Sequence, residues 1–305
     1  MVDNLKLQVF LRGGLGNQLF QYATGLYLSE KFNKELVLRS DLLPSAEDKV
    51  GGVTRWPEQI SSFCHSGTVL NRVHQPKNST NLFSKYMQIL RMIGDVSPSL
   101  PPRFNWLSTE TKADFLPKKI GRIGVINSYS AFKEFAVENR DKLRDQVPKL
   151  FSPSDGFLSS LEKVKQQNPI IVHIRRGDYV GLERLYGHFD TDYYLEGIEH
   201  LRAQAQSEKT WIFSDAPRDI SRRFLDRLGV DRVIGPEDIA SPLENLVLMG
   251  SGSALLGANS SFSWWAGLIS SEANPVVAPR FTSARFNNFS DFDEKMLGWK
   301  LVDII

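Results

Sequence analysis

The chain has 305 residues, of which 41% are hydrophobic and 24% are charged, and its formal net charge at pH 7 is only +2. This composition is typical of a globular protein, and neither the net charge nor any basic run indicates a binder of nucleic acid. A length of about twice that of a common domain predicts two domains.

The cysteine content and the hydropathy pattern indicate in which cellular compartment the protein is expected. A single cysteine, Cys64, excludes an intramolecular disulfide and a cysteine-rich metal site. No stretch approaches the roughly 18 to 20 apolar residues of a membrane span, and the N-terminal residues lack the apolar segment of a signal peptide. We therefore expect a cytoplasmic protein without a membrane span, for which peripheral association with a membrane remains open.

The first predicted elements form a βαβ unit. Residues 5–11 (LKLQVFL) are a short apolar run that ends in glycines, which predicts a strand followed by a turn. A helix is predicted next, because one helical stripe collects the apolar residues Leu19, Phe20, Ala23, Leu26 and Tyr27. A second strand is predicted at 35–38. The region from about 45 to 120 is less regular and contains a candidate helix at 82–93.

From residue 156 onward, predicted helices and strands alternate. The strands are expected at 170–174, 210–214, 231–234, 253–258 and 275–278, and the helices at 156–167, 192–205, 218–228, 241–249 and about 262–271. This alternation predicts a parallel, doubly wound α/β sheet. We place the domain boundary near residue 155, which gives domains 1–155 and 156–305. Two such halves facing each other would leave a ligand-binding cleft at the carboxyl ends of their strands.

The segment VHIRRGDYV, residues 172–180, turns abruptly from apolar to cationic at the end of a predicted buried strand. Side chains alternate between the two faces of a strand, so His173 and Arg175 share one face while Val172 and Ile174 share the other. A titratable histidine among apolar neighbours is unusual for a buried strand and marks this face as a candidate site.

The two adjacent arginines, Arg175 and Arg176, suit an anionic ligand such as a phosphate. A guanidinium group donates two hydrogen bonds in a fork and remains charged at any physiological pH. A surface ion pair with Asp178 explains the same charges equally well when this segment is considered alone.

The segment LLGANSSFSWWAGLIS, residues 255–270, runs from an apolar strand through a small, hydroxyl-rich loop into a helix. Ser260, Ser261 and the free backbone N–H groups at the start of that helix make a natural anion site. A serine N-cap followed by core aromatic residues would use the same donors. We assign Ser260, Ser261 and Phe262 to the site, and the following pair of tryptophans to the core.

The segment RGGLGNQLFQYA, residues 12–23, places a glycine turn between the first strand and helix. Gly14 and Gly16 fit the start of a dinucleotide-binding fingerprint, but its third glycine is absent, which argues against an NAD-dependent enzyme. Asn17 and Gln18 place amides at the start of the helix, where they can cap it or reach a ligand.

Acidic residues follow or precede several predicted elements. Asp215 comes directly after the strand at 210–214, where its carboxylate can accept hydrogen bonds from a nucleoside or cap the next helix. Asp190-Thr191-Asp192 has the D-x-D spelling of metal-dependent sugar-nucleotide enzymes, but it directly precedes a helix, so N-capping explains it better. The histidines show no metal-ligand spacing, and we predict neither a metal nor another cofactor.

Four motifs occur in the order GGLGNQLFQYA, HIRRGDY, FSDA and NSSFSWW. Together they resemble the motifs of the α-1,2-fucosyltransferases of glycosyltransferase family 11, and related motifs occur in α-1,6- and protein O-fucosyltransferases. The matching segments run from residue 12 to about 279, with weak similarity over 45–150. HIRRGDY combined with NSSFSWW is a specific pair.

The resemblance implies a GT-B fold, with two facing Rossmann-like, doubly wound domains and a cleft between them. The N-terminal domain would lie on the acceptor side, and the C-terminal domain would bind GDP-fucose. The implied reaction needs no metal: it transfers L-fucose from GDP-β-L-fucose, with inversion, to the 2-hydroxyl of a galactose-terminated glycan. The implied donor-binding residues are Gly14, Gly16, Asn17, Arg176, Asp215, Ser260, Ser261 and Phe262, and the implied catalytic residues are Arg175, His173 and Asp178.

Within this set, the resemblance implies that Arg175 holds the β-phosphate with His173 beside it, and that Asp215 contacts the guanosine. We name Asp178 as the general base for the acceptor hydroxyl. The chain departs from the family pattern at Ala216, where a second acid usually follows FSD, and this departure bears on the guanine contacts.

The expected chemistry agrees with these residues. As fucose leaves through an oxocarbenium-like state, negative charge grows on GDP, and without a metal it must be stabilised by preorganised cationic and N–H donors. Two alternatives are another sugar-nucleotide transferase of different linkage, such as α-1,6-fucosyl, and a non-catalytic module that binds a glycan or nucleotide. A binding module would need neither the arginine for the leaving group nor two facing α/β halves.

Overall fold

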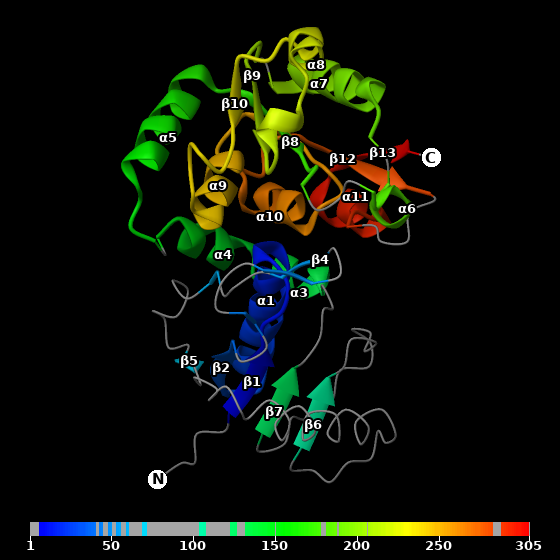
Figure 1. Cartoon of the computed structure of the whole chain (residues 1–305). Helices are drawn as coiled ribbons and strands as arrows, with labels where there is room; N and C mark the ends of the chain where they lie inside the picture. Colours follow the sequence, from blue (N-terminus) through cyan, green and yellow to red (C-terminus); the bar gives the residue numbers. More distant parts are fainter. Residues whose placement is uncertain are drawn as a thin grey trace. The chain divides into compact units, whose positions relative to one another are not determined.

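The computed structural model describes residues 6–40, 43–44, 48–50, 53–55, 59–60, 69–71, 104–107, 123–126, 132–149, 151–177, 181–187, 189–205, 207–282 and 288–304. The chain divides into two compact units, Met1–Leu143 and Arg144–Ile305 (Figure 1). Each unit is built on a parallel sheet, which confirms the predicted α/β class. The candidate helix at 82–93 lies outside the described residues.

The first unit contains a five-stranded parallel sheet in the order β5-β2-β1-β7-β6, and a separate antiparallel pair, β3-β4. Its strands are β1 Lys6–Phe10, β2 Glu35–Arg39, β3 Asp48–Val50, β4 Val53–Arg55, β5 Val69–Asn71, β6 Phe104–Leu107 and β7 Ile123–Ile126. Its described helices are α1 Leu15–Lys31, α3 Lys133–Glu138 and most of α4 Arg140–Gln146. The opening βαβ unit is therefore as predicted.

The second unit contains a six-stranded sheet in which every neighbouring pair is parallel. Its strands are β8 Ile170–Ile174, β9 Thr210–Ser214, β10 Arg232–Ile234, β11 Ala254–Leu256, β12 Val276–Phe281 and β13 Lys300–Ile304. Its helical segments are η3 Val147–Lys149, α5 Asp155–Gln167, α6 Glu183–Tyr186, α7 Thr191–Ala205, η4 Pro217–Asp219, α8 Arg222–Leu228, α9 Pro242–Met249, α10 Ser261–Ile269 and α11 Asp291–Leu297.

The strand order of this sheet is β10-β9-β8-β11-β12-β13, so the winding direction reverses between β8 and β11. The first three strands of the unit extend to one side and the last three to the other, which is the order of a Rossmann-like, doubly wound sheet. Ligands of such sheets bind outside the carboxyl ends of the strands at the reversal point. That point therefore locates the candidate site of this unit.

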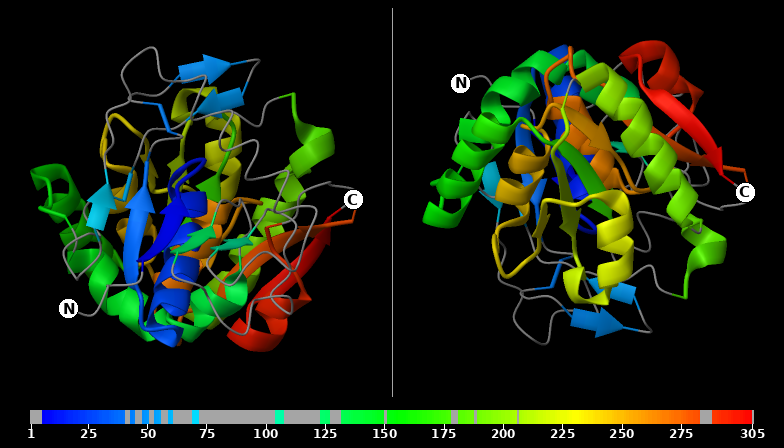
Figure 2. Two further views of the ribbon diagram at one scale, coloured as in Figure 1. Left: turned by 90° about the horizontal axis from the view of Figure 1, so that it is seen from below. Right: turned by 90° about the horizontal axis from the view of Figure 1, so that it is seen from above.

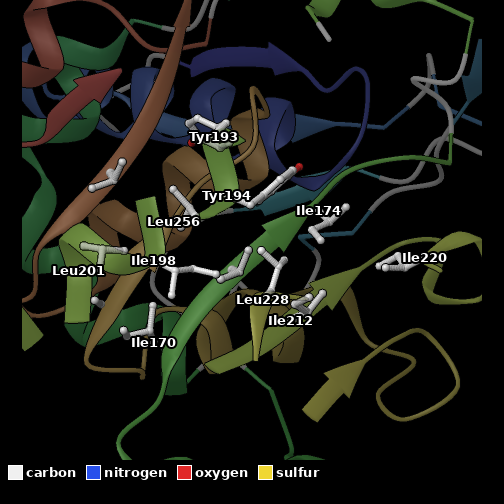
Figure 3. Packing of buried hydrophobic residues seen from close by; sticks show 13 residues of the cluster. Ile170, Ile174, Tyr193, Tyr194, Ile198, Leu201, Ile212, Ile220, Leu228 and Leu256 are labelled. Atoms are coloured by element: carbon white, nitrogen blue, oxygen red, sulfur yellow. The ribbon is translucent and has the colours of Figure 1, made fainter. Parts of the chain in front are cut away.

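Helices cover both faces of the second sheet (Figures 1 and 2). One face packs against α7 and α8, and Figure 3 shows its apolar side chains meeting between helix and strands. The buried cluster consists of Ile170, Val172, Ile174, Tyr193, Tyr194, Ile198, Leu201, Ile212, Ile220, Leu228, Ala254, Leu256 and Val277. Burial of each large side chain contributes about 1.5–3 kcal/mol. The even-numbered residues of β8 all lie on this face, so its odd-numbered residues point to the opposite one, as predicted.

The predicted helix at 218–228 is interrupted. The structure has a short 3-10 segment, η4, followed by α8, and the hydroxyl of Ser221 caps α8 by accepting from the N–H of Phe224. Serine at this position favours a helix start, and Pro217 favours the turn before it. Helix α11 and strand β13 were not predicted. None of the described helices combines the length and apolar composition needed to cross a lipid bilayer.

The division between the two units falls between Leu143 and Arg144. The boundary predicted from the sequence was near residue 155, which is later in the chain. The intervening segment belongs with the second unit because its contacts lie there. The buried carboxylate of Glu244 in α9 accepts hydrogen bonds from the backbone N–H and the hydroxyl of Ser154, at 2.6 and 2.9 Å. No periodicity in the sequence reveals such a contact.

Candidate functional site

Two loops leave the carboxyl edge of the second sheet at the reversal point. Strand β8 ends at Ile174, and residues 175–177 follow it. Strand β11 pairs with β8 in parallel register and ends at Leu256, so residues 257–260 begin at the same edge. We call these segments the arginine loop and the serine loop.

The carboxylate of Asp215, directly after β9, organises the arginine loop. One of its oxygens accepts the N–H of Arg176 at 2.9 Å, and the other accepts the N–H of Gly177 at 3.1 Å. The second oxygen also lies 3.1 Å from the guanidinium of Arg175. A side chain on Gly177 would not fit, because its Cβ would lie 2.7 Å from that oxygen. The predicted alternative that Asp215 caps the following helix is wrong, since Ser221 caps α8.

Arg175 and Arg176 have different partners. The side chain of Arg175 is mostly buried, with 18% exposed, and it faces a carboxylate that is 20% exposed. The guanidinium of Arg176 instead donates to the carbonyl of Asp219 in η4 at 3.2 Å. The surface ion pair weighed for these arginines involved Asp178, which lies outside the described residues. Arg175 is therefore held at the end of β8 with its charge close to the sheet edge.

His173 lies on the face of β8 opposite to Val172 and Ile174 and is almost fully buried. Its Nδ1 is 2.5 Å from the hydroxyl oxygen of Ser263 in α10, and its ring is tilted against Phe262 with centroids 5.8 Å apart. Burial lowers the pKa of His173 to about 4; the positive charge of Arg175 acts in the same direction, and the Asp215 carboxylate opposes them. The imidazole is therefore neutral near pH 7.

The serine loop caps helix α10. The hydroxyl of Ser260 accepts the N–H of Phe262 at 3.2 Å, and Ser261 is the first residue of the helix. Both tryptophans that follow are fully buried, as predicted. The indole N–H of Trp264 donates to the buried carboxylate of Asp293 in α11 at 2.7 Å, and this bond connects α10 to α11. The start of α10 therefore presents backbone N–H groups at the reversal point.

Further hydrogen bonds hold the serine loop in place. The hydroxyl of Tyr193 donates to the carbonyl of Gly257 at 2.6 Å. The buried Asn259 donates to the carbonyl of Tyr186 at 2.8 Å and accepts the N–H of Asn288 at 2.7 Å. The loop is therefore fixed before any ligand arrives, which favours electrostatic stabilisation without reorganisation.

In the first unit, the glycine turn leads from β1 into α1. The left-handed conformation, with φ of +71°, belongs to Gly13. Gly14 is the N-cap residue of α1, whereas Gly16 and Asn17 lie in its first turn. The fully buried amide of Gln18 is used internally, because it donates to the carbonyl of Gly13 at 2.7 Å.

The D-x-D segment caps a helix, as predicted. One carboxylate oxygen of Asp190 accepts the N–H of Tyr193 at 2.9 Å, which is an N-cap interaction for α7. Asp192 pairs with Arg227 of α8 at 3.5 Å on the surface. Across the part of the chain that the structure describes, no three His, Cys, Asp or Glu side chains gather in a way that could hold a metal ion.

Two residues of this site were missed by sequence reasoning. Ser263 lies between Phe262, which was assigned to the site, and Trp264, which was assigned to the core. Its position on the helix places its side chain against His173 of β8. Its hydroxyl oxygen also accepts the N–H of Ala258 at 3.1 Å. Gly177 is the other missed residue. The sequence signal that could have found it is its position directly after two arginines.

Comparisons with known proteins bear on the whole chain. A sequence model described as glycosyl transferase family 11 matches residues 125–302, which include both loops. An alpha-1,2-colitosyltransferase from Escherichia coli is 28% identical over 303 residues, covering 93% of this chain and 96% of the relative. The O-antigen biosynthesis glycosyltransferase WbnK from Escherichia coli is 25% identical, with 88% and 92% covered.

Solved structures of fucosyltransferases show distant similarity. POFUT1 in complex with GDP matches at 13% identity and a TM-score of 0.48, covering 90% of this chain and 98% of that one. NodZ alpha-1,6-fucosyltransferase co-crystallized with GDP matches at 14% identity and a TM-score of 0.42, with 88% and 93% covered. The match of the family model to more than half of the sequence identifies the chain as a member of glycosyl transferase family 11.

Proposed function

We propose that this chain transfers L-fucose from GDP-β-L-fucose to the 2-hydroxyl of a galactose-terminated glycan, with inversion at the fucose and without a metal ion. Family membership supports glycosyl transfer. The four motifs resemble those of α-1,2-fucosyltransferases, and a relative that matches nearly the whole chain is named for an α-1,2 linkage. In this proposal the second unit binds the donor and the first unit belongs to the acceptor side.

The observation that carries the proposal is the convergence of two anion-binding features at the reversal point of the second sheet. Arg175 supplies a positive charge held by Asp215. Helix α10 supplies N–H groups from a half-buried start that the hydroxyl of Ser260 caps. A nucleoside diphosphate needs both a cation and N–H donors, and doubly wound sheets bind nucleotides at this point.

In the proposed reaction, these groups act on the leaving GDP. As the bond between fucose and the β-phosphate breaks, negative charge grows on the diphosphate, and Arg175 and the start of α10 stabilise it. Such donors contribute roughly 3 kcal/mol each when they are preorganised. His173, neutral and beside Arg175, is proposed to donate to the same group.

A single displacement is proposed because the two described loops offer no carboxylate nucleophile. Residues 175–177 and 257–260 contain no carboxylate side chain, and Asp215 is engaged with the arginine loop. Double displacement would need a carboxylate beside the anomeric carbon. Attack by the acceptor hydroxyl then inverts the β-linked donor to an α-fucoside, with Asp178 proposed as its general base.

A second candidate is transfer of colitose in the same linkage, since one of the relatives is named an alpha-1,2-colitosyltransferase. Colitose differs from fucose by lacking the 3-hydroxyl, so the two donors compete for one site without any change in the diphosphate contacts. The two functions differ only in how the sugar is recognised.

The deciding experiment incubates the purified protein with GDP-fucose or nucleotide-activated colitose and a panel of galactosides. Mass spectrometry and proton NMR of the products identify the sugar, the anomer and the linkage. We expect an α-fucoside on the 2-hydroxyl of galactose. A β-fucoside would overturn the proposed mechanism. An α-fucoside on another hydroxyl would overturn only the assignment of the 2-position, and exclusive use of colitose would overturn the assignment of the donor sugar. Failure to turn over or hydrolyse any donor would favour a binding module.

A further inference from the structure

We propose that Ser263 is a positioning residue for this reaction: its hydroxyl holds His173 in the tautomer that carries the proton on Nε2. The ring N–H is then available to the donor diphosphate beside Arg175. This inference rests on the proposed function for its catalytic consequence. The tautomer itself follows from hydrogen bonds within the second unit.

The first step is the direction of the hydrogen bonds at Ser263. The N–H of Ala258 can only donate, so the hydroxyl oxygen accepts it at 3.1 Å. The hydroxyl proton then needs an acceptor. Within the described surroundings the other partner of this fully buried oxygen is Nδ1 of His173, at 2.5 Å. Donation to Nδ1 satisfies both groups, whereas a protonated Nδ1 would leave the buried hydroxyl proton without an acceptor.

The second step is the protonation state of the ring. His173 is buried in β8, two residues before Arg175, and burial together with the charge of Arg175 lowers its pKa to about 4. A neutral imidazole has one proton, and the nitrogen that accepts from Ser263 cannot carry it. The proton therefore lies on Nε2. An outer partner that fixes a histidine tautomer is a common arrangement where the ring must present one particular nitrogen.

The third step is that Ser263 joins β8 to the serine loop. It lies in the first turn of α10, whose start presents N–H groups for an anion, while its side chain reaches His173 in the strand that precedes Arg175. Phe262 packs its ring against that of His173 from the same turn. Ser263 thus orients the ring of His173 in β8 and also holds the serine loop through the N–H of Ala258.

The test combines a spectroscopic and a kinetic readout. The chain contains five histidines, so nitrogen-15 NMR of histidine-labelled protein at pH 7 can resolve the tautomer of each, with His173→Gln to assign the signal. We expect the Nε2–H tautomer in the wild type and a mixed or inverted tautomer in Ser263→Ala. In Ser263→Ala we also expect kcat to fall about tenfold with a smaller change in the KM for GDP-fucose, because the charge on the leaving group is larger in the transition state than in the bound substrate.

Two variants serve as controls. Ser263→Thr keeps the hydroxyl and should retain the tautomer. Ser270→Ala removes another buried hydroxyl from the end of α10, where it donates to the carbonyl of Gly267 at 2.7 Å, and should change neither readout.

A wild-type His173 protonated on Nδ1 would overturn the inference without any variant, as would an unchanged tautomer and kcat in Ser263→Ala. If the wild type transfers no fucose to any acceptor, the proposed function fails. The spectrum then still decides whether Ser263 sets the tautomer.

Discussion

The carboxylate of Asp215 and the guanidinium of Arg175 pair at 3.1 Å, and the same carboxylate accepts two consecutive backbone N–H groups of the arginine loop. An acid at the end of one strand thereby fixes the loop that follows its neighbour. Both carboxylate oxygens already have partners, so the structure explains Asp215 as an organiser of the loop. Contact with guanosine, which the resemblance implies, remains a prediction.

Replacing Asp215 should therefore lower activity through Arg175. In Asp215→Asn, an amide N–H group takes the place of one acceptor and faces a backbone N–H. A loss of about 1–3 kcal/mol, or roughly 5- to 150-fold in kcat/KM, is the scale for such a mismatch. Asp238→Asn is the matched control, because Asp238 accepts the N–H of Gly235 in another loop of the same unit at 2.9 Å. Equal losses in the two variants would show that the effect is not specific to the arginine loop.

Arg175→Ala should abolish transfer while leaving the fold intact. It removes the positive charge at the leaving group, and the expected loss is roughly 3 kcal/mol or more, over a hundredfold in kcat. Arg175→Lys should restore little, because an ammonium group lacks the planar fork. Arg218→Ala, which breaks an exposed pair with Glu237, serves as the control in the same assay. Activity of Arg175→Ala within a few-fold of the wild type would contradict the assignment.

Transfer should continue in excess EDTA, and Asp190→Asn should be fully active. The carboxylate of Asp190 caps α7, and asparagine is an equally good N-cap, whereas a metal ligand would not tolerate the loss of charge. Asp190→Ala should lower the free energy of unfolding by about 1 kcal/mol. Initial rates with and without chelator, and urea denaturation of both variants, check these outcomes. Activity that is lost in EDTA and restored by manganese would show a metal role.

The buried His173 should make stability depend on pH. Its pKa is lowered to about 4 in the folded state, so between about pH 6.5 and 4 the unfolded chain binds a proton that the folded chain does not. The contribution of His173 to the free energy of unfolding is fully present above pH 6.5. It is lost as the pH falls below that value, by up to about 1.4 kcal/mol per pH unit. Chemical denaturation of the wild type and His173→Gln at several pH values isolates the effect. Parallel pH profiles for the two proteins would argue against the lowered pKa.

Much of the second unit could be predicted from sequence because its strands are short apolar runs separated by helical periodicity. The strand at 170–174 and the strand at 210–214 match β8 and β9 in full. The helix predicted at 241–249 is α9, and the hydroxyl of Ser241 caps it. Helix α11 was missed because its stability comes from tertiary contacts and caps, such as the capping box of Ser290 and Asp293, and little from an apolar stripe.

The site was only partly predictable for the same physical reason. Alternation along β8 correctly placed His173 on the face opposite to Val172 and Ile174, since it depends only on local geometry. The partners of these residues come from other elements: Asp215 follows β9, and Ser263 lies in α10. A single sequence contains no signal for which carboxylate or hydroxyl a given side chain will meet across a sheet.

The contact between His173 and Ser263 joins residues 90 positions apart in the chain. Parallel strands cannot pair through a hairpin, so β8 finds β11 only after a long loop has closed, and such closure slows folding. We therefore expect this contact to form late, after the central strands of the unit have aligned. During refolding, the low pKa of His173 would then be recovered later than the circular dichroism signal of the helices, and its recovery would show that the native sheet has formed.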